Sequence, residues 1–237
     1  MQDNPAAQRR RIFLMRHGSV TYFDDDGKPY PPDDVPLNER GRAQTTAAGQ
    51  AFAQQNVRFD RVIVSNLPRT IESAQRVLAE TGQQIELEQW PEFQEVRGGV
   101  LEDILDDDLE EAFTGAFSCM AAEHKKFLDG ESIGELIDRI HPVIDRLRAD
   151  PSWDTVLLVL HGGVNRAVLS YAITGQRLFL GNLEQAPGCI NVMDVGACAN
   201  DWVVHTINYA PHSPLQTESR LTTMEEVLHQ YRKSRHS

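Results

Sequence analysis

The sequence has few cysteines, and none of them form a close pair. Its 237 residues include three, Cys119, Cys189 and Cys198, without any CxxC spacing. An odd number of scattered cysteines argues against a disulfide scaffold and is typical of a reducing compartment. The sequence also contains no HExxH motif, no Cys/His zinc spacing and no Walker lysine motif. We therefore predict neither a metal ion nor a cofactor, and we interpret the aspartate runs at 24–26 and 106–108 as solvated loops.

Long hydrophobic runs are also missing. No stretch approaches the ~20 apolar residues that a membrane helix needs. Near the N-terminus, the arginines at 9–11 are followed by only four apolar residues, 12–15, and a signal peptide needs a longer run. These features predict a cytoplasmic protein without a membrane partner.

Positive charge is scarce. The chain has 23 lysines and arginines against 35 aspartates and glutamates, which gives a formal net charge of -12. This balance argues against binding to nucleic acid or to an anionic membrane surface. If the ligand is itself an anion, the chain must gather its positive charge in one local pocket.

Apolar runs typical of strands alternate along the chain with patterns typical of helices. We expect strands at 12–15, 61–65 and 155–160, and a final hairpin of 189–195 with 202–207. We expect helices at 41–55, 68–81, 132–149 and 164–174. This alternation predicts an α/β fold, a three-layer α/β/α sandwich with a mostly parallel central sheet.

No repeat or low-complexity linker marks an internal domain boundary. We expect a single domain over 1–237, with a core at about 11–212 and a polar C-terminal tail, 213–237, that contains a short helical pattern around 224–231. Residues 90–128 are mixed and acidic. We interpret that stretch as a helical insertion over the active site that shapes specificity.

Two of the expected strands end in the same way. The first continues into Arg16-His17-Gly18, and the strand at 155–160 continues into His161-Gly162-Gly163. In open parallel sheets, ligands bind beyond the carboxyl ends of the strands, so both histidines are placed to face one ligand. The glycines, Gly162 among them, let the backbone approach an anion and offer it N–H groups.

A third strand, 61–65, leads to Arg69 at the start of the following helix. Helix N-termini favour anions, and an arginine fork suits two phosphate oxygens. Taken alone, a histidine at a strand end is more often structural, and an arginine near a helix start is usually solvated. Their joint occurrence at three strand ends favours a phosphate site instead.

The same residues belong to a series of motifs that resembles the histidine phosphatase superfamily, also called the phosphoglycerate-mutase-like family (branch 1 type). The six matching segments keep the family's order over most of the chain. They are LMRHG at 14–18, PLNERGRAQ at 36–44, SNLPRT at 65–70, GES at 130–132, LHGG at 160–163 followed by Arg166, and INY at 207–209 with His212.

The resemblance implies phosphoryl transfer through His17. This residue would attack phosphorus through a ring nitrogen, which requires a neutral imidazole. Arg16 and Arg69 would lower the pKa of His17 by repelling its imidazolium form. Together with His161, the two arginines would donate hydrogen bonds to the equatorial phosphoryl oxygens.

The leaving alkoxide also needs a proton donor, which in this family is often a carboxylic acid between the SNLPRT and GES segments. Glu95, in FQEVRGG at 93–99, fits this position best, with Glu92 and Glu102 as rivals and a surface glutamate as the alternative interpretation. A bound phosphate nearby would favour the protonated form that an acid requires.

The sequence departs from the mutase pattern after Gly18. Phe23 stands where an asparagine would contact the phosphate, and Tyr22 replaces a tryptophan. Thr21 or Ser19 could supply the missing phosphate donor. An apolar Phe23 at the mouth of the site suggests a substrate less polar than phosphoglycerate.

These features predict a metal-independent phosphomonoesterase of the histidine acid phosphatase type that acts on a small-molecule phosphate ester. Two alternatives stay open: a cofactor-dependent phosphoglycerate mutase, and a non-catalytic phosphate-binding relative that keeps the fold. The sequence does not identify the substrate, and a homodimer is compatible with it.

Overall fold

A mixed, mostly parallel sheet forms the centre of the molecule. The computed structural model describes residues 9–23, 28, 30–31, 33–196, 198, 200–217 and 219–234. Its strands are β1 (Arg10–Arg16), β2 (Arg61–Val64), β3 (Leu87–Gln89), β4 (Thr155–Leu160), β5 (Ile190–Val195) and β6 (Trp202–Tyr209). They lie in the order β3-β2-β4-β1-β5-β6. The first four in that order run parallel, whereas β5 pairs antiparallel with both β1 and β6. The predicted parallel sheet and terminal hairpin are confirmed.

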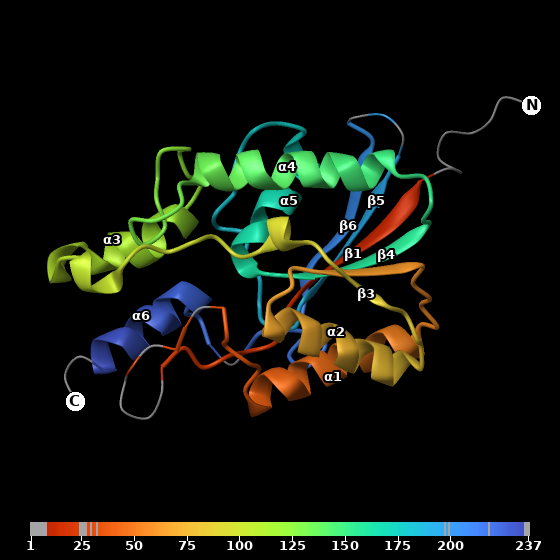
Figure 1. Cartoon of the computed structure of the whole chain (residues 1–237), viewed down its shortest axis with the longest axis horizontal. Coiled ribbons are helices and arrows are strands. Elements are labelled where there is room, and N and C mark those ends of the chain that lie inside the picture. The colour runs from red at the N-terminus through yellow and green to blue at the C-terminus, as the bar shows by residue number, and fades with distance from the viewer. Residues whose placement is uncertain are drawn as a thin grey trace, which may run out of the picture.

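Helices cover both faces of the sheet. They are α1 (Glu39–Gln54), α2 (Pro68–Thr81), α3 (Leu109–Thr114), α4 (Ile133–Ala149), α5 (Gly162–Thr174) and α6 (Thr223–Ser234). In Figure 1, α1 and α2 lie on one side of the sheet, and α4 and α5 lie on the other. The helices α3 and α6 lie together at one end of the molecule, opposite the end where β1 begins. The predicted three-layer α/β/α architecture is therefore confirmed.

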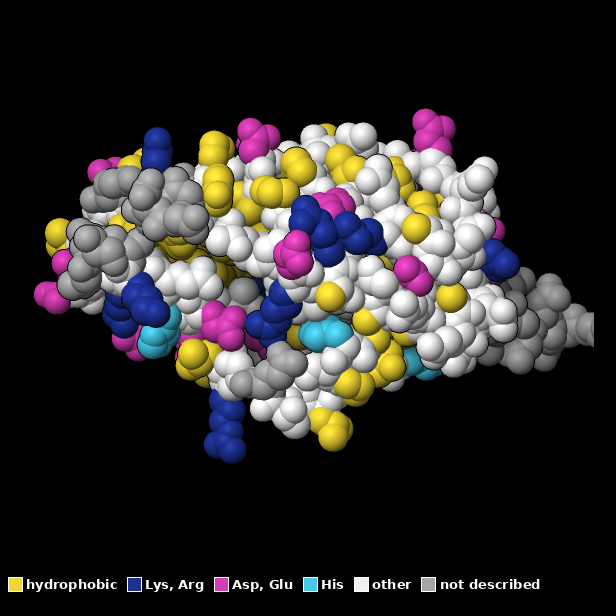
Figure 2. Space-filling view, turned by 90° about the horizontal axis from the view of Figure 1, so that it is seen from below, with side chains coloured by type: hydrophobic (Ala, Val, Ile, Leu, Met, Phe, Trp, Pro, Cys, Tyr) yellow, Lys and Arg dark blue, Asp and Glu magenta, His cyan; other side chains and the backbone are white. Residues whose placement is uncertain are grey.

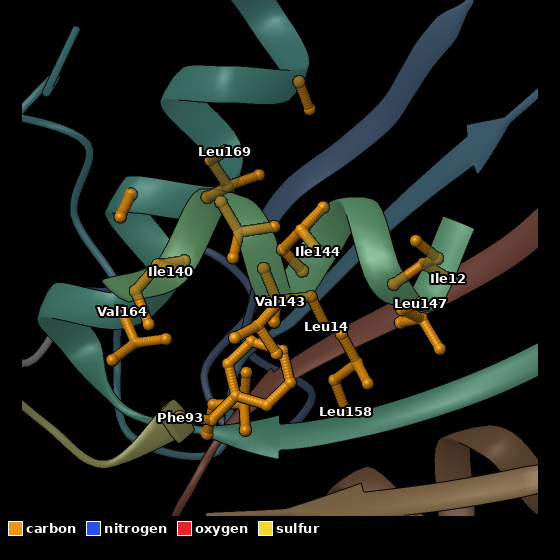
Figure 3. Packing of buried hydrophobic residues seen from close by; sticks show 14 of the residues in the cluster. Ile12, Leu14, Phe93, Ile140, Val143, Ile144, Leu147, Leu158, Val164 and Leu169 are labelled. Carbon is orange, nitrogen blue, oxygen red and sulfur yellow. The ribbon is translucent and has the colours of Figure 1, made fainter. Parts of the chain in front are cut away.

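The sheet separates two hydrophobic cores because its central strands are apolar on both faces. Along β1, Ile12 and Leu14 point toward α4 and α5, whereas Phe13 and Met15 belong to the core under α1 and α2. Figure 3 shows the first core, where α4 and α5 pack over β1 and β4 around the ring of Phe93.

Local signals in the sequence set the helix boundaries. Ser132 and Glu135 form a reciprocal capping box at the start of α4, and Pro68 occupies the first turn of α2, where its missing N–H costs nothing. Apolar residues in α4 recur at helical spacing, and those from Ile133 to Leu147 on this stripe are buried.

A third hydrophobic cluster lies outside the two main cores, at the end of the molecule where α3 and α6 meet. We call it the end cluster. Its buried members are Ile104, Leu109, Phe113, Leu128, Leu228 and Tyr231, and Phe23, Leu101, Ala112, Phe127, Met224 and Val227 pack against them. The cluster therefore joins three distant parts of the chain: the loop after β1, the 90–128 insertion and the C-terminal helix.

Three features differ from the expected pattern or add to it. The short edge strand β3 has no apolar alternation that would predict it, and its pairing with β2 alone defines it. The insertion at 90–128 contains one six-residue helix, α3, and otherwise short 3-10 turns. The C-terminal segment contains α6 where a short helical pattern was predicted, and this helix packs on α3 instead of belonging to a polar tail. None of the helices in the described part of the chain is both long and apolar enough to cross a membrane.

Candidate active site

The two predicted histidines meet at the carboxyl edge of the sheet. Because β1 and β4 are parallel neighbours, with Arg16 opposite Leu160, the residues that follow each strand lie side by side. The His17 N–H donates to the Leu160 carbonyl at 3.0 Å. The His17 and His161 rings are 5.1 Å apart between centroids and roughly perpendicular, and both side chains are buried.

A hydrogen bond to the backbone fixes the tautomer of His17. Its Nδ1 lies 2.7 Å from the Gly18 carbonyl oxygen, which can only accept a hydrogen bond. The ring proton of neutral His17 is therefore on Nδ1, and the lone pair is on Nε2. Nε2 is the atom that this arrangement leaves available as a nucleophile.

Both histidines are held in the neutral form. Burial is the largest cause that lowers the pKa of His17 well below its usual value of 6.5, and the positive charges of Arg69 and Arg16 lower it further. The pKa of His161 is also lowered well below 6.5, first by burial and then by Arg69. The direction agrees with the prediction for His17, but desolvation outweighs the repulsion that the sequence suggested.

A short chain of hydroxyl groups positions His161. Its Nε2 lies 2.7 Å from the Ser65 hydroxyl, which lies 3.2 Å from the Thr70 hydroxyl. Thr70 in turn donates to the Leu67 carbonyl at 2.8 Å, so its oxygen is left to accept. The buried Nδ1 of His161 has no hydrogen-bond partner among the described residues. The SNLPRT segment thus orients the second histidine as well as carrying Arg69.

Arg16 and Arg69 supply the buried positive charge that the acidic composition required. Arg16 is 6% exposed and Arg69 is 5% exposed. Nη1 of Arg16 donates to the Gln185 carbonyl and, at 2.8 Å, to the Thr223 hydroxyl at the start of α6. Its Nε has no partner within the described part of the chain. A buried guanidinium with an unused donor is suited to bind an anion.

A cavity of about 430 Å³ opens beside these residues. Its lining includes Arg16, Arg69 and Gly162, whereas His17 and His161 are not among the lining residues. Four arginines and two carboxylates belong to the described lining, so the cavity concentrates positive charge in an acidic protein.

Glu95 lines the same cavity and contacts the start of α5. Its carboxylate accepts hydrogen bonds from the N–H of Gly163, at 3.1 Å to each oxygen, and from the N–H of Val164 at 3.3 Å. Its rival Glu92 forms an ion pair with Arg146 on the surface instead. The side chain of Glu102, the other rival, lies outside the described part. The position of Glu95 therefore fits an acid at this site better than that of Glu92.

The GES segment holds the backbone that carries Glu95. Glu131 forms a two-pronged ion pair with Arg139 of α4, at 2.7 and 2.9 Å. The same guanidinium donates to the carbonyls of Glu92 and Gln94, each at 2.7 Å. Both partners of the ion pair are largely buried. This motif therefore holds in place the segment that carries Glu95.

Close backbone contact between two motifs fixes the loop after His17. A Cβ added to Gly18 would come within 2.3 Å of the Gly41 carbonyl oxygen, and a Cβ on Gly41 would come within 2.1 Å of the Ser19 carbonyl oxygen. Gln44 of α1 accepts the Ser19 N–H at 2.8 Å. The PLNERGRAQ segment thus acts as a support for the loop that follows the nucleophile.

The predicted phosphate donor Thr21 lies away from the cavity. Its exposed hydroxyl accepts a hydrogen bond from the Asn38 side chain at 3.2 Å, and Thr21 is absent from the lining residues. Phe23 does line the cavity, as its sequence position suggested, and its ring packs 6.0 Å from that of Tyr231.

Two further residues at the site could not be predicted from the sequence. Thr223 contacts Arg16 from a position 207 residues away, and Gln185 supports Arg16 through its carbonyl. The side chain of Gln185 is buried in a network with Asn165 and Asn191. Asn165 and Asn191, each next to apolar residues in the sequence, are the signal that could have pointed to this network.

Metal ligands are not gathered anywhere in the described residues: no group of three or more His, Cys, Asp or Glu side chains is arranged to hold a metal ion. The aspartates at 24–26 lie outside the described part, and those at 106–108 form an exposed 3-10 turn.

The lowered pKa values predict a loss of stability in weak acid. As the pH falls below 6.5, His17 and His161 become protonated in the unfolded chain but stay neutral in the folded chain, because their folded pKa values are lowered. Protonation therefore stabilises the unfolded state, and the free energy of unfolding decreases. Between pH 7.5 and 5.5, each such histidine should remove about 1.4 kcal/mol of unfolding free energy. Urea unfolding at both pH values, in buffer without phosphate, measures this loss. In the variant His17→Asn the loss should shrink by about 1.4 kcal/mol. An equal loss in both proteins would contradict the assignment of a buried neutral His17.

Comparison with known proteins identifies relatives by sequence and solved structures with the same fold. The 6-phosphofructo-2-kinase/fructose-2,6-bisphosphatase of Gallus gallus is 29% identical over 164 residues, which cover 68% of this chain and 32% of that protein. The chain thus spans about a third of the length of the curated relatives it matches.

Solved structures share the fold over most of this chain. The alpha-ribazole phosphatase from Shigella flexneri superposes with a TM-score of 0.64 at 22% identity, covering 84% of this chain and 96% of that one. The phosphoglycerate mutase from Bacillus anthracis superposes with a TM-score of 0.64 at 18% identity, covering 85% and 93%. At these identities the likeness concerns the fold alone.

The family of this chain is shown by a match that includes both histidine motifs. The model of the histidine phosphatase superfamily (branch 1) matches residues 12–209, which run from β1 to the end of β6. With this match and the shared fold, the chain belongs to branch 1 of the histidine phosphatase superfamily.

Proposed function

We propose that the chain is a metal-independent phosphomonoesterase that hydrolyses a small-molecule phosphate ester through a phosphohistidine on His17. One observation carries the proposal. His17 is buried and neutral with its proton fixed on Nδ1, and it lies next to two buried arginines that line a cavity. A neutral nucleophilic nitrogen beside a concentrated positive charge is what attack on a phosphate dianion needs.

The first step transfers the phosphoryl group to the enzyme. Nε2 of His17 forms a bond to phosphorus, and the bond from phosphorus to the ester oxygen breaks. Arg16 and Arg69 stabilise the charge on the equatorial oxygens. His161 would supply a further donor through Nδ1, with the Ser65 hydroxyl giving its single proton to Nε2 of His161 rather than to Thr70. Gly162 offers its backbone at the same edge of the cavity.

Glu95 gives its proton to the departing alkoxide. To do so it must carry a proton when the ester oxygen leaves. In the second step a water molecule attacks the phosphohistidine, Glu95 takes up its proton, and the bond from phosphorus to Nε2 breaks. Inorganic phosphate and the original enzyme result.

The alternatives fit the site less well. Phe23 and the apolar side chains around the cavity do not favour a small phosphorylated hydroxy acid such as phosphoglycerate. A purely binding role would leave the fixed tautomer of His17 and the placement of Glu95 without a use.

Hydrolysis of p-nitrophenyl phosphate in EDTA tests the proposal. We expect turnover by the wild-type chain and a loss of at least about 10³-fold in His17→Ala, because the covalent route disappears. The matched control is His205→Ala, a half-exposed histidine on β6 paired with Asp194, which should keep the wild-type rate. Absence of turnover by the wild type would overturn the proposal and lead to a mutase assay and then to ligand binding.

Glu95→Gln tests the assignment of the acid. An alkyl phosphate has a poor leaving group that needs a proton, so its kcat should fall by about 10²-fold. The rate with p-nitrophenyl phosphate should fall much less, because nitrophenolate leaves without help. Glu92→Gln is the matched control, and it should slow neither substrate. Equal losses with both substrates in Glu95→Gln would contradict the role of Glu95 as the acid.

A further inference from the structure

The cavity changes character away from the arginines. Besides Arg16, Arg69, Glu95 and the glycines, its lining contains seven side chains of the end cluster. These are Phe23, Leu101, Phe113, Phe127, Leu128, Met224 and Val227. The end cluster contributes no charged side chain to the described lining. In Figure 2, hydrophobic side chains lie in a hollow toward the end of the molecule that carries α3 and α6.

The side of the cavity formed by the end cluster, here called the apolar wall, begins directly beside Arg16. Thr223, the first residue of α6, accepts a hydrogen bond from Arg16 at 2.8 Å. The next residue, Met224, and Val227 one turn later both line the cavity and pack in the end cluster. One helix therefore reaches from the arginine to the hydrophobic wall, so a single ligand can contact both.

The side chains of the apolar wall pack against one another and against buried neighbours. Phe113 is 1% exposed and Leu128 is 8% exposed, and the Phe113 and Tyr231 rings are 5.7 Å apart. Phe23, Met224 and Val227 are only partly buried, and all three line the cavity. Apolar surface left open in this way is stabilised when a hydrophobic group covers it.

Two charged residues belong to the lining away from the phosphate side, and both are exposed to solvent. They are Asp33 and Arg97. Because both remain in contact with water, they impose little desolvation cost when the wall is covered. A sugar hydroxyl or a carboxylate placed against the wall, by contrast, would lose its hydrogen bonds to water and find no replacement there.

We propose that the alcohol part of the substrate is an uncharged hydrophobic group, aliphatic or aromatic, and that Met224 and Val227 of α6 determine this specificity. The inference rests on the proposed phosphomonoesterase function. A volume of about 430 Å³ is within the range of sites that enclose a small organic molecule. The phosphate would bind at Arg16 and Arg69, and the hydrophobic group would lie against the end cluster.

The test compares n-hexyl phosphate with glycerol 3-phosphate, which are both primary alkyl esters. Phosphate release should give a kcat/KM at least about tenfold higher for the hexyl ester. Met224→Gln and Val227→Thr keep the size of the side chain but add polarity. Each should lower the hexyl-to-glycerol ratio several-fold. Ile207→Thr, at an exposed position on β6, is the matched control and should leave the ratio as in the wild type.

Equilibrium binding of n-hexylphosphonate and methylphosphonate separates this inference from the function on which it rests. Tighter binding of the hexyl compound, lost in Val227→Thr, supports the hydrophobic site even if no ester is hydrolysed, and in that case only the proposed function fails. Turnover with a ratio near one, or with a preference for glycerol 3-phosphate, would overturn the inference and leave the phosphatase intact. Equal binding of the two phosphonates, or binding of neither, would overturn it as well.

Discussion

The burial of two arginines at the carboxyl edge of the sheet is the constraint on which the rest of the site depends. A guanidinium removed from water is costly unless it has hydrogen-bond partners, and Arg16 obtains part of its set from the Gln185 carbonyl and the Thr223 hydroxyl. The Nε of Arg16 has no hydrogen-bond partner among the described residues, and this unused donor is suited to bind an anion. The same charges, with burial, keep His17 and His161 neutral, so in the proposed function one arrangement would both bind the anion and prepare His17 as the nucleophile.

Much of the surrounding structure serves to hold this arrangement in place. The glycine contact between the loop after β1 and the start of α1 fixes the backbone around His17. The ion pair of Glu131 with Arg139 fixes the segment that carries Glu95. Precise placement of this kind matters because phosphoryl transfer depends on positioning and on charge stabilisation more than on covalent chemistry by side chains. The family motifs are therefore distributed between residues for chemistry and residues that support them.

The sequence predicted the sheet and the two histidine motifs because each depends on local patterns. A strand such as β4 is apolar from Val156 onward, and two such strands are each followed by a His-Gly pair. Glu95 was predicted from the residues around it in the chain, and the structure places it in the lining of the cavity. What the sequence did not predict depends on distant contacts. Thr223 reaches Arg16 only because α6 packs on α3, and β3 exists only because it pairs with β2. Thr21, chosen from its place in the motif alone, hydrogen bonds to Asn38 on the surface instead.

The central claim is that His17 becomes phosphorylated, and direct capture of that intermediate tests it most sharply. The chain is mixed with a phosphate ester, quenched in alkali within the first turnovers, and analysed by mass spectrometry of its peptides. The account predicts a single alkali-stable, acid-labile phosphoryl group on the peptide that contains His17, absent from His17→Ala. Phosphate release without any modification of that peptide, or modification of a different residue, would contradict the account.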